Sequence, residues 1–119
     1  MARTRSAPGT FIAAVGADNP EKSEIAPALM AASRVVADVL SQCVVMGDLH
    51  HAIRAGAMSA EDVDGELADL VTGRKHGRRG RDEITLFDAT GTAIQDVAAA
   101  ACAYEAALAR GLGQRVSLN

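Results

Sequence analysis

The apolar residues of this chain fall into short runs separated by glycine, proline and charged residues, a pattern typical of strands alternating with helices. Residues 10–15 form an apolar run of strand length that ends at Gly16. Residues 34–40 form a second, nearly continuous run, as in a strand covered on both faces of a parallel sheet. Residues 83–88 alternate polar and apolar positions and predict a third strand. The pattern therefore predicts an α/β fold built on a parallel sheet.

Helical spacing occupies the segments between these strands. After the first strand, a helix is predicted with Pro27 in its first turn, where the missing N–H is tolerated. Residues 41–55 keep a helical spacing that is broken near Gly47, so they predict one bent helix or two short ones. The hydroxyl of Ser59, followed by two acids, predicts the start of a helix that runs to Gly73.

The last predicted element is a long alanine-rich helix from Thr92 to Ala109, which ends before Gly111. An apolar stripe runs along it and consists of Ile94, Val97, Ala98, Ala101, Tyr104 and Leu108. Small alanines flank this stripe, so we expect the helix to be buried on more than one side. Such a helix needs a partner to cover its apolar surface.

Composition narrows the range of partners. The 119 residues suit one modest domain, and a net charge of −3 argues against general attraction to nucleic acid. No apolar run approaches the roughly 20 residues that cross a bilayer, and residues 1–9 are an irregular lead-in without the apolar segment of a signal peptide. We therefore expect a cytoplasmic protein with no nucleic-acid or membrane partner.

The cysteines and histidines do not have the spacing of a metal site. Cys43 and Cys102 lie far apart, each in an apolar stretch, and are predicted to be buried free thiols. His50 and His51 are neighbours on a predicted helix, so their side chains point about 100° apart. No metal ion is therefore expected.

A basic run extends from Arg74 to Arg81 among glycines. It contains no aromatic residue that could stack on a base, so a solvated, mobile loop is favoured over a nucleic-acid surface. Pairing of one arginine with a buried carboxylate or a cofactor phosphate is the remaining alternative.

Two acids accompany the predicted strands. Asp18 follows the first strand, at the kind of edge where open α/β sheets bind ligands, but Asp-Asn-Pro also forms turns for backbone reasons alone. Asp38 lies near the end of the second strand. Its carboxylate is predicted to accept hydrogen bonds from backbone N–H groups of the following turn, with a second functional acid as the alternative.

Several short pieces, taken in order, resemble the carboxyl-terminal third of the ornithine cyclodeaminase and mu-crystallin family. They extend from about Gly9 to Gly111, nearly the whole chain. The pieces are Ala14 to Asp18 with Pro20, Lys22 and Glu24; Val35 to Asp38; Gly47 to Leu49; Gly73 to Lys75 with Gly77 and Arg78; and Ile84 to Asp88 with Thr90, Gly91, Gln95 and Asp96. Each piece is unspecific alone, and the resemblance rests on the order and spacing that the pieces share with the family.

The resemblance implies part of a Rossmann-type parallel sheet, followed by a long helix that packs on a separate dimerisation domain or partner. The implied boundaries are a lead-in at 1–9, the carboxyl-terminal part of an NAD(P)-binding domain at 10–91, the helix at 92–111 and a tail at 112–119.

The same resemblance implies a site. Asp18 matches an acid that lies beside the nicotinamide and the amino-bearing carbon of the substrate, where it assists proton transfer or the attack that follows hydride removal. Val15 and Gly16 would line the nicotinamide of NAD or NADP, and the turn Ala89-Thr90 would lie near its carboxamide. Many members of the family carry serine where this chain has Ala89, which removes one hydrogen-bond donor.

The resemblance implies a fragment of an ornithine cyclodeaminase-like, NAD(P)-dependent enzyme. By hydride transfer, such an enzyme deaminates and cyclises a small amino acid or reduces a cyclic imine. No glycine-rich phosphate turn is present in the sequence, and Gly-Leu-Gly-Gln at 111–114 closes a helix rather than opening one. We therefore expect the chain to be inactive alone, and to need a homo-oligomer or an N-terminal portion. The alternative is a non-catalytic α/β module for oligomerisation or ligand binding.

Overall fold

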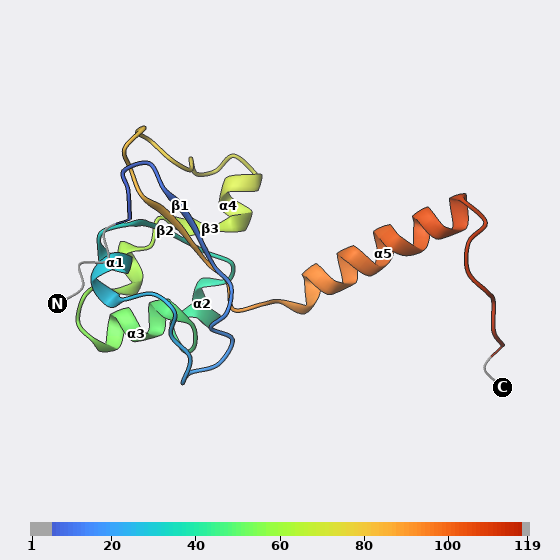
Figure 1. Ribbon diagram of the computed structural model, residues 1–119, viewed down its shortest axis with the longest axis horizontal. Helices are drawn as coiled ribbons and strands as arrows, with labels where there is room; N and C mark the ends of the chain where they lie inside the picture. The colour runs from blue at the N-terminus through green and yellow to red at the C-terminus, as the bar shows by residue number, and fades with distance from the viewer. Residues whose placement is uncertain (1–5, 118–119) are drawn as a thin grey trace.

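The computed structural model describes residues 6–117 and contains a four-stranded parallel sheet with the order β1-β4-β2-β3 (Figure 1). This confirms the predicted α/β fold with parallel strands. Ile12, Leu86 and Val35 lie side by side in neighbouring strands, so they point to the same face of the sheet. The strands are β1 (Phe11–Ala14), β2 (Arg34–Ala37), β3 (Gly65–Glu66) and β4 (Thr85–Asp88).

The predicted strands are each longer than the observed ones. In β2 the reason is Asp38, whose Oδ1 accepts the N–H of Val39 at 2.7 Å and so turns the chain out of the sheet. The helix α2 then begins at Leu40, within the predicted strand. Part of the predicted lead-in, residues 1–5, lies outside the described residues, as do the last two residues of the tail.

The helices largely follow the predicted pattern. Pro27 opens the first helix as expected, and the break near Gly47 separates two short helices. The helices are α1 (Pro27–Ala31), α2 (Leu40–Cys43), α3 (Asp48–Arg54), α4 (Leu67–Val71) and α5 (Ala93–Ala109).

The prediction of one helix from Ser59 to Gly73 is wrong. Ser59 does cap a turn, by a capping box with Asp62, but that 3₁₀ turn ends at Asp62. Asp64 then donates its N–H to the carbonyl of Val35 at 2.9 Å, which draws the chain to the edge of β2 as β3. Because β2 offers free carbonyls at its edge, sheet pairing replaces the helix that the local pattern favours.

One face of the sheet carries the core. Buried residues of β2 and β4 pack there against α1 and α3, which lie together on that side (Figure 1). The core consists of Ala14, Met30, Val35, Ala37, Cys43, Leu49, Ala52, Val63 and Leu86. On the opposite face Phe11 is exposed, and α4 lies only at the β3 edge. This second face is therefore largely open.

The basic run is tied to the rest of the chain at several points. Arg78 donates to the carbonyl of Thr10 at 3.1 Å and to the hydroxyl of Thr85 at 3.0 Å. Arg79 pairs with Asp64 at 3.2 Å. Asp64 also pairs at 2.9 Å with Arg34, a nearly buried side chain of β2. The run thus connects strands β1 and β4 to the β3 edge, a role that sequence interpretation did not predict.

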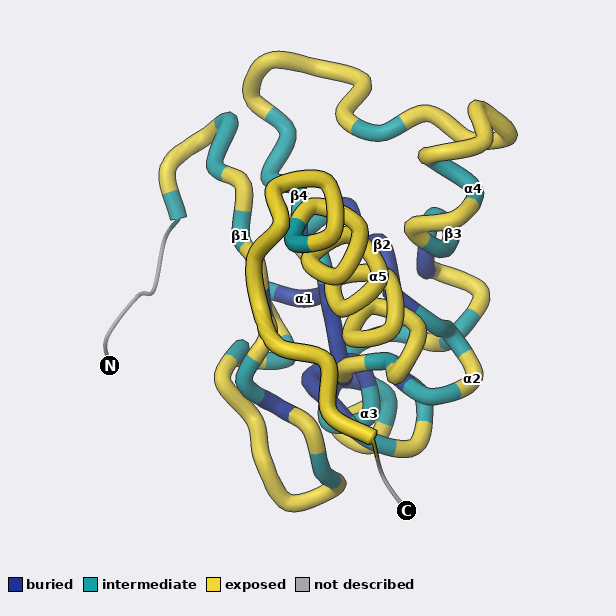
Figure 2. Tube along the Cα trace, turned by 90° about the vertical axis from the view of Figure 1, so that its right-hand side faces the viewer, coloured by how far each residue is buried: buried dark blue, intermediate teal, exposed yellow. Residues whose placement is uncertain are grey.

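The long helix α5 forms as predicted, with Thr92 as its N-cap residue. It extends away from the sheet, and none of its residues is buried (Figures 1 and 2). The expectation that it is buried on more than one side is therefore not met within this chain, and Cys102 is exposed rather than buried. Among the described residues, no helix is long and apolar enough to span a bilayer.

Candidate functional site

Three segments meet at the carboxyl ends of β1, β4 and β2. They are the loop 15–24 after β1, the turn 89–91 after β4, and Gly47 before α3. A Cβ atom at Gly47 would lie 2.8 Å from Cγ2 of Thr90, 3.4 Å from Oδ1 of Asp88 and 3.5 Å from the carbonyl of Ala17. The absence of a side chain at Gly47 therefore lets the three segments approach one another.

The loop after β1 presents the predicted residues Val15, Gly16 and Asp18. The side chain of Asp18 is 61% exposed, and its Oδ1 accepts a hydrogen bond from Nζ of Lys22 at 2.6 Å. This hydrogen bond and the charge of Lys22 lower the pKa of Asp18 below its ordinary value. Asp18 is therefore an ionised carboxylate at neutral pH, at the edge of the sheet. Val15, three residues earlier in the chain, is 64% exposed.

The turn after β4 contains the predicted residues Ala89 and Thr90, both of which are buried. Oδ2 of Asp38 accepts the N–H of Thr90 at 2.9 Å and the N–H of Gly91 at 3.0 Å. The predicted structural role of Asp38 is therefore confirmed, since backbone N–H groups satisfy its carboxylate. The donors come from the turn of the neighbouring strand as well as from Val39.

Two further acids, Asp48 and Asp88, are fully buried behind this edge. Oδ2 of Asp88 accepts the N–H of Leu49 at 2.9 Å. Within residues 6–117, neither Oδ1 of Asp88 nor Oδ2 of Asp48 has a hydrogen-bond partner. Sequence analysis did not predict this pair, because an acid at the start of a helix is common for dipole reasons alone.

Burial raises the pKa of Asp88 to about 6, and the nearby charges of Asp48 and Asp38 act in the same direction. The folded state therefore binds a proton more tightly at Asp88 than the unfolded state does. This contribution to stability is present at low pH and is lost as the pH rises through about 6.

The variant Asp88→Asn is expected to remove this dependence. Asparagine keeps an oxygen for the N–H of Leu49 and adds a donor on the side of the unpaired oxygen. The difference in unfolding free energy, variant minus wild type, should therefore increase by roughly 2–3 kcal/mol from pH 4 to pH 7. Urea denaturation at both pH values measures the gain, and an equal difference at both would contradict the assignment.

The buried thiol of Cys43 and the ring of His50 are each engaged by neighbouring protein groups. Burial and a hydrogen bond to Asp38 raise the pKa of the Cys43 thiol to about 12, so the thiol is an unreactive neutral group. His50 is hydrogen-bonded through Nδ1 to the carbonyl of Val44 at 3.1 Å. In the part of the chain that the structure describes, no three His, Cys, Asp or Glu side chains are grouped to hold a metal ion.

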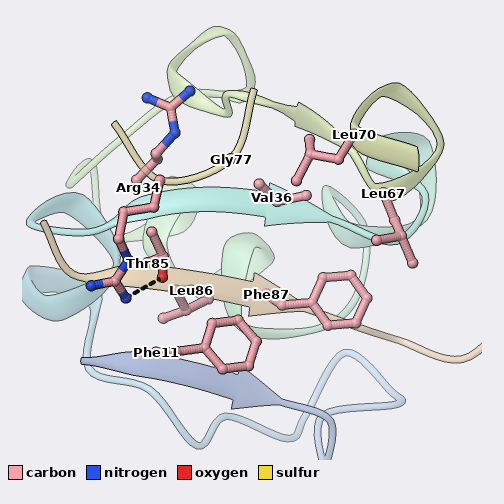
Figure 3. A pocket seen from close by; sticks show the side chains of 10 residues that line it. Phe11, Arg34, Val36, Leu67, Leu70, Gly77, Thr85, Leu86 and Phe87 are labelled. Carbon is pink, nitrogen blue, oxygen red and sulfur yellow. Dashed lines mark hydrogen bonds between the residues drawn. The ribbon is translucent and has the colours of Figure 1, made fainter. Parts of the chain in front are cut away.

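A hollow of about 280 Å³ lies elsewhere, on the open face of the sheet (Figure 3). Apolar side chains line most of it, with Phe11 and Phe87 at one side and Leu67 and Leu70 of α4 at the other. None of the predicted site residues lines it. This hollow belongs to the uncovered sheet face rather than to the carboxyl edge.

Solved enzymes with bound NAD or NADH contain a region with the same fold as this chain. The sequence model of the ornithine cyclodeaminase/mu-crystallin family matches residues 5–111. The chain therefore belongs to this family, as the resemblance predicted.

Individual relatives agree with this assignment. The alanine dehydrogenase of Archaeoglobus fulgidus is 40% identical over 108 residues, which are 91% of this chain and 34% of that enzyme. An archaeal alanine dehydrogenase dimer with bound NAD matches 95% of this chain and 35% of its own, with a TM-score of 0.85 and 38% identity. The Δ1-pyrroline-2-carboxylate reductase of Thermococcus litoralis, in complex with NADH and L-proline, matches 92% and 34%, with a TM-score of 0.86 and 33% identity. The chain thus spans about a third of the length of these relatives.

Proposed function

We propose that this chain supplies the nicotinamide-facing third of an NAD(P)-dependent enzyme that transfers hydride to or from a small amino acid or a cyclic imine. The supporting observation is the match over residues 5–111 to a family whose similar members include a dehydrogenase and an imine reductase. In this proposal, residues 10–91 belong to the NAD(P)-binding domain, 92–111 form a connecting helix and 112–119 a tail.

Asp18 is the catalytic residue of the proposal. A nicotinamide held at this edge would supply hydride-transfer chemistry at the substrate carbon. Asp18, ionised and exposed at the sheet edge, is suited to take a proton from the amino group of the substrate or from an attacking nucleophile. Lys22 keeps Asp18 ionised at neutral pH, so the carboxylate can accept a proton in the direction that oxidises an amino acid, while the lowered pKa makes it a weak base.

Val15, Gly16, Ala89 and Thr90 are the proposed cofactor contacts. Val15 offers an exposed apolar side chain to a flat ring, and the buried turn at Ala89 and Thr90 is held rigidly by Asp38. The residues therefore fit the nicotinamide end of the cofactor. They do not fit its phosphates, because the carboxyl edge is rich in acids, and a pyrophosphate needs a glycine-rich turn at a helix N-terminus.

The chain is therefore proposed to be inactive alone and to act with further protein. Two uncovered surfaces support this part of the proposal, namely the open sheet face with its apolar hollow and the exposed stripe of α5. An N-terminal portion or a second subunit would cover them, and the archaeal alanine dehydrogenase is itself a dimer. NAD and NADP remain equal candidates for the cofactor.

A chimera tests this proposal. Residues 5–111, the range of the family match, replace the matching third of the Archaeoglobus fulgidus alanine dehydrogenase, which is 40% identical to this chain over 108 residues. We expect the chimera to form NADH from NAD⁺ and alanine, and the isolated 119-residue chain to form none. A folded chimera without activity, or an active isolated chain, would overturn the proposal.

The second candidate is a non-catalytic oligomerisation module, and the exposed stripe of α5 favours it. Val97 and Tyr104 are a heptad apart on this stripe and both are exposed. If the isolated chain elutes as an oligomer in size-exclusion chromatography, Val97→Lys with Tyr104→Lys should return it to a monomer. Ala99→Lys with Ala106→Lys, on the opposite side of the helix, is the matched control.

A further inference from the structure

Asp48 is a buried acid that binds a segment outside its own helix. Its Oδ1 accepts the N–H of Glu24 at 2.7 Å, the N–H of Ile25 at 2.8 Å and the hydroxyl of Ser23 at 3.2 Å. Hydrogen bonds from backbone N–H groups to a carboxylate are among the stronger ones in proteins. All three donors belong to the end of the segment that begins after β1, so Asp48 anchors the far end of the Asp18 loop.

The side chain of Glu24 connects this anchored end of the loop to the start of the loop. Its Oε2 accepts the N–H of Gly16 at 3.0 Å. A Cβ atom at Gly16 would overlap the Glu24 carboxylate, so the glycine leaves the space in which Glu24 reaches the backbone. Asp48 thus fixes the backbone of Glu24, and the side chain of Glu24 fixes Gly16, two residues before Asp18.

The position of Asp48 is itself fixed by β4. Asp88, the last residue of β4, accepts the N–H of Leu49, which follows Asp48 in α3. Asp48 has no exposed surface, so its carboxylate has no solvent to replace these donors. A continuous set of hydrogen bonds therefore connects β4 through α3 to the loop after β1.

We propose that Asp48 is a positioning residue, which holds the loop carrying Val15, Gly16 and Asp18 in a fixed place relative to β4 and the turn 89–91. Asp48 does not touch the reacting groups in this proposal. Its relevance to catalysis rests on the function proposed for Asp18, whereas its hold on the loop is a property of this chain alone.

Amide hydrogen exchange of the 119-residue chain, followed by NMR, tests the hold. In Asp48→Ala, the Glu24 and Ile25 amides should exchange at least about tenfold faster than in the wild type, because a lost bond of about 1.4 kcal/mol is a factor of ten. Asp48→Asn keeps an acceptor oxygen and should restore most of the protection. Val63→Ala, a core change far from the loop in sequence, is the control. It should not change the protection of the Glu24 and Ile25 amides relative to that of the other amides in the chain.

Unchanged protection of Glu24 and Ile25 in Asp48→Ala would overturn the proposal. If Asp48→Ala does not fold, Glu24→Ala replaces it, since Glu24 is exposed and its side chain binds only the loop. The Gly16 amide should then exchange about tenfold faster while the Ile25 amide remains protected. An unchanged Gly16 amide would equally overturn the proposal.

The alanine dehydrogenase chimera separates this inference from the proposed function. There, Asp48→Ala should lower kcat by more than about tenfold with Asp48→Asn restoring most of it, and Val63→Ala should leave kcat near the parent value. If the parent chimera is folded but inactive, the proposed function fails while the exchange result still decides the role of Asp48. If the chimera is active and Asp48→Ala keeps full kcat, the positioning role fails alone.

Discussion

Replacing Asp18 with alanine is expected to lower kcat of the alanine dehydrogenase chimera by about 10²–10⁴-fold, the usual contribution of general acid–base catalysis. Asp18 is exposed at the carboxyl edge, and Lys22 lowers its pKa, so the side chain is an ionised base at neutral pH. The measurement is the initial rate of NADH formation at saturating alanine and NAD⁺. Binding of NAD⁺ should change little, because Val15, Gly16, Ala89 and Thr90 are intact.

Glu21→Ala is the matched control for this prediction. Glu21 is an exposed acid in the same loop, three residues beyond Asp18, and its backbone N–H binds the side chain of Asn19. Its removal changes the charge of the loop by the same amount as the removal of Asp18. A full rate in Asp18→Ala, or an equal loss in Glu21→Ala, would show that Asp18 is not the base.

Substitution of Gly47 by alanine is expected to cost about 3 kcal/mol of unfolding free energy. Gly47 has φ 90° and ψ −174°, a conformation that residues with a Cβ rarely adopt. The added methyl group would also lie 2.8 Å from the side chain of Thr90, where three segments meet. Chemical denaturation of the 119-residue chain measures the loss.

Gly56→Ala is the reference for a positive φ without a steric contact. Gly56 also has a positive φ, of 65°, but a Cβ atom there meets no other atom within 4 Å. It should therefore cost only about 1 kcal/mol, from backbone strain alone. Equal losses at Gly47 and Gly56 would mean that the three segments do not pack closely around Gly47.

The sequence predicted those parts of the fold that local pattern determines. The continuous apolar run of β2, Pro27 at the start of α1 and the break at Gly47 were all interpreted correctly. The segment after Ser59 was not, because pairing of Asp64 with the edge of β2 depends on residues far away in sequence. Long-range pairing of this kind leaves no periodic signal in the strand that it recruits.

Some residues of the candidate site could be predicted from the sequence, and others could not. Asp18 and the turn at Ala89 and Thr90 are predicted as site residues through the family resemblance; the family assignment is confirmed, and the roles of these residues stay predictions. The buried acids Asp48 and Asp88 were not recognisable as a pair. Both acids are buried only because the fold brings β4 and α3 together. Their hydrogen bonds, from Asp88 to α3 and from Asp48 to the loop, depend on the same packing.

In the function proposed above, this chain contributes the nicotinamide side of a cofactor site and needs further protein to complete it. Fluorescence titration of NADH and NADPH, into the isolated chain and into the alanine dehydrogenase chimera, tests this most directly. We expect saturable binding of one or both cofactors by the chimera and no saturable binding by the isolated chain. Micromolar binding by the isolated chain, or a folded chimera that binds neither cofactor, would contradict it.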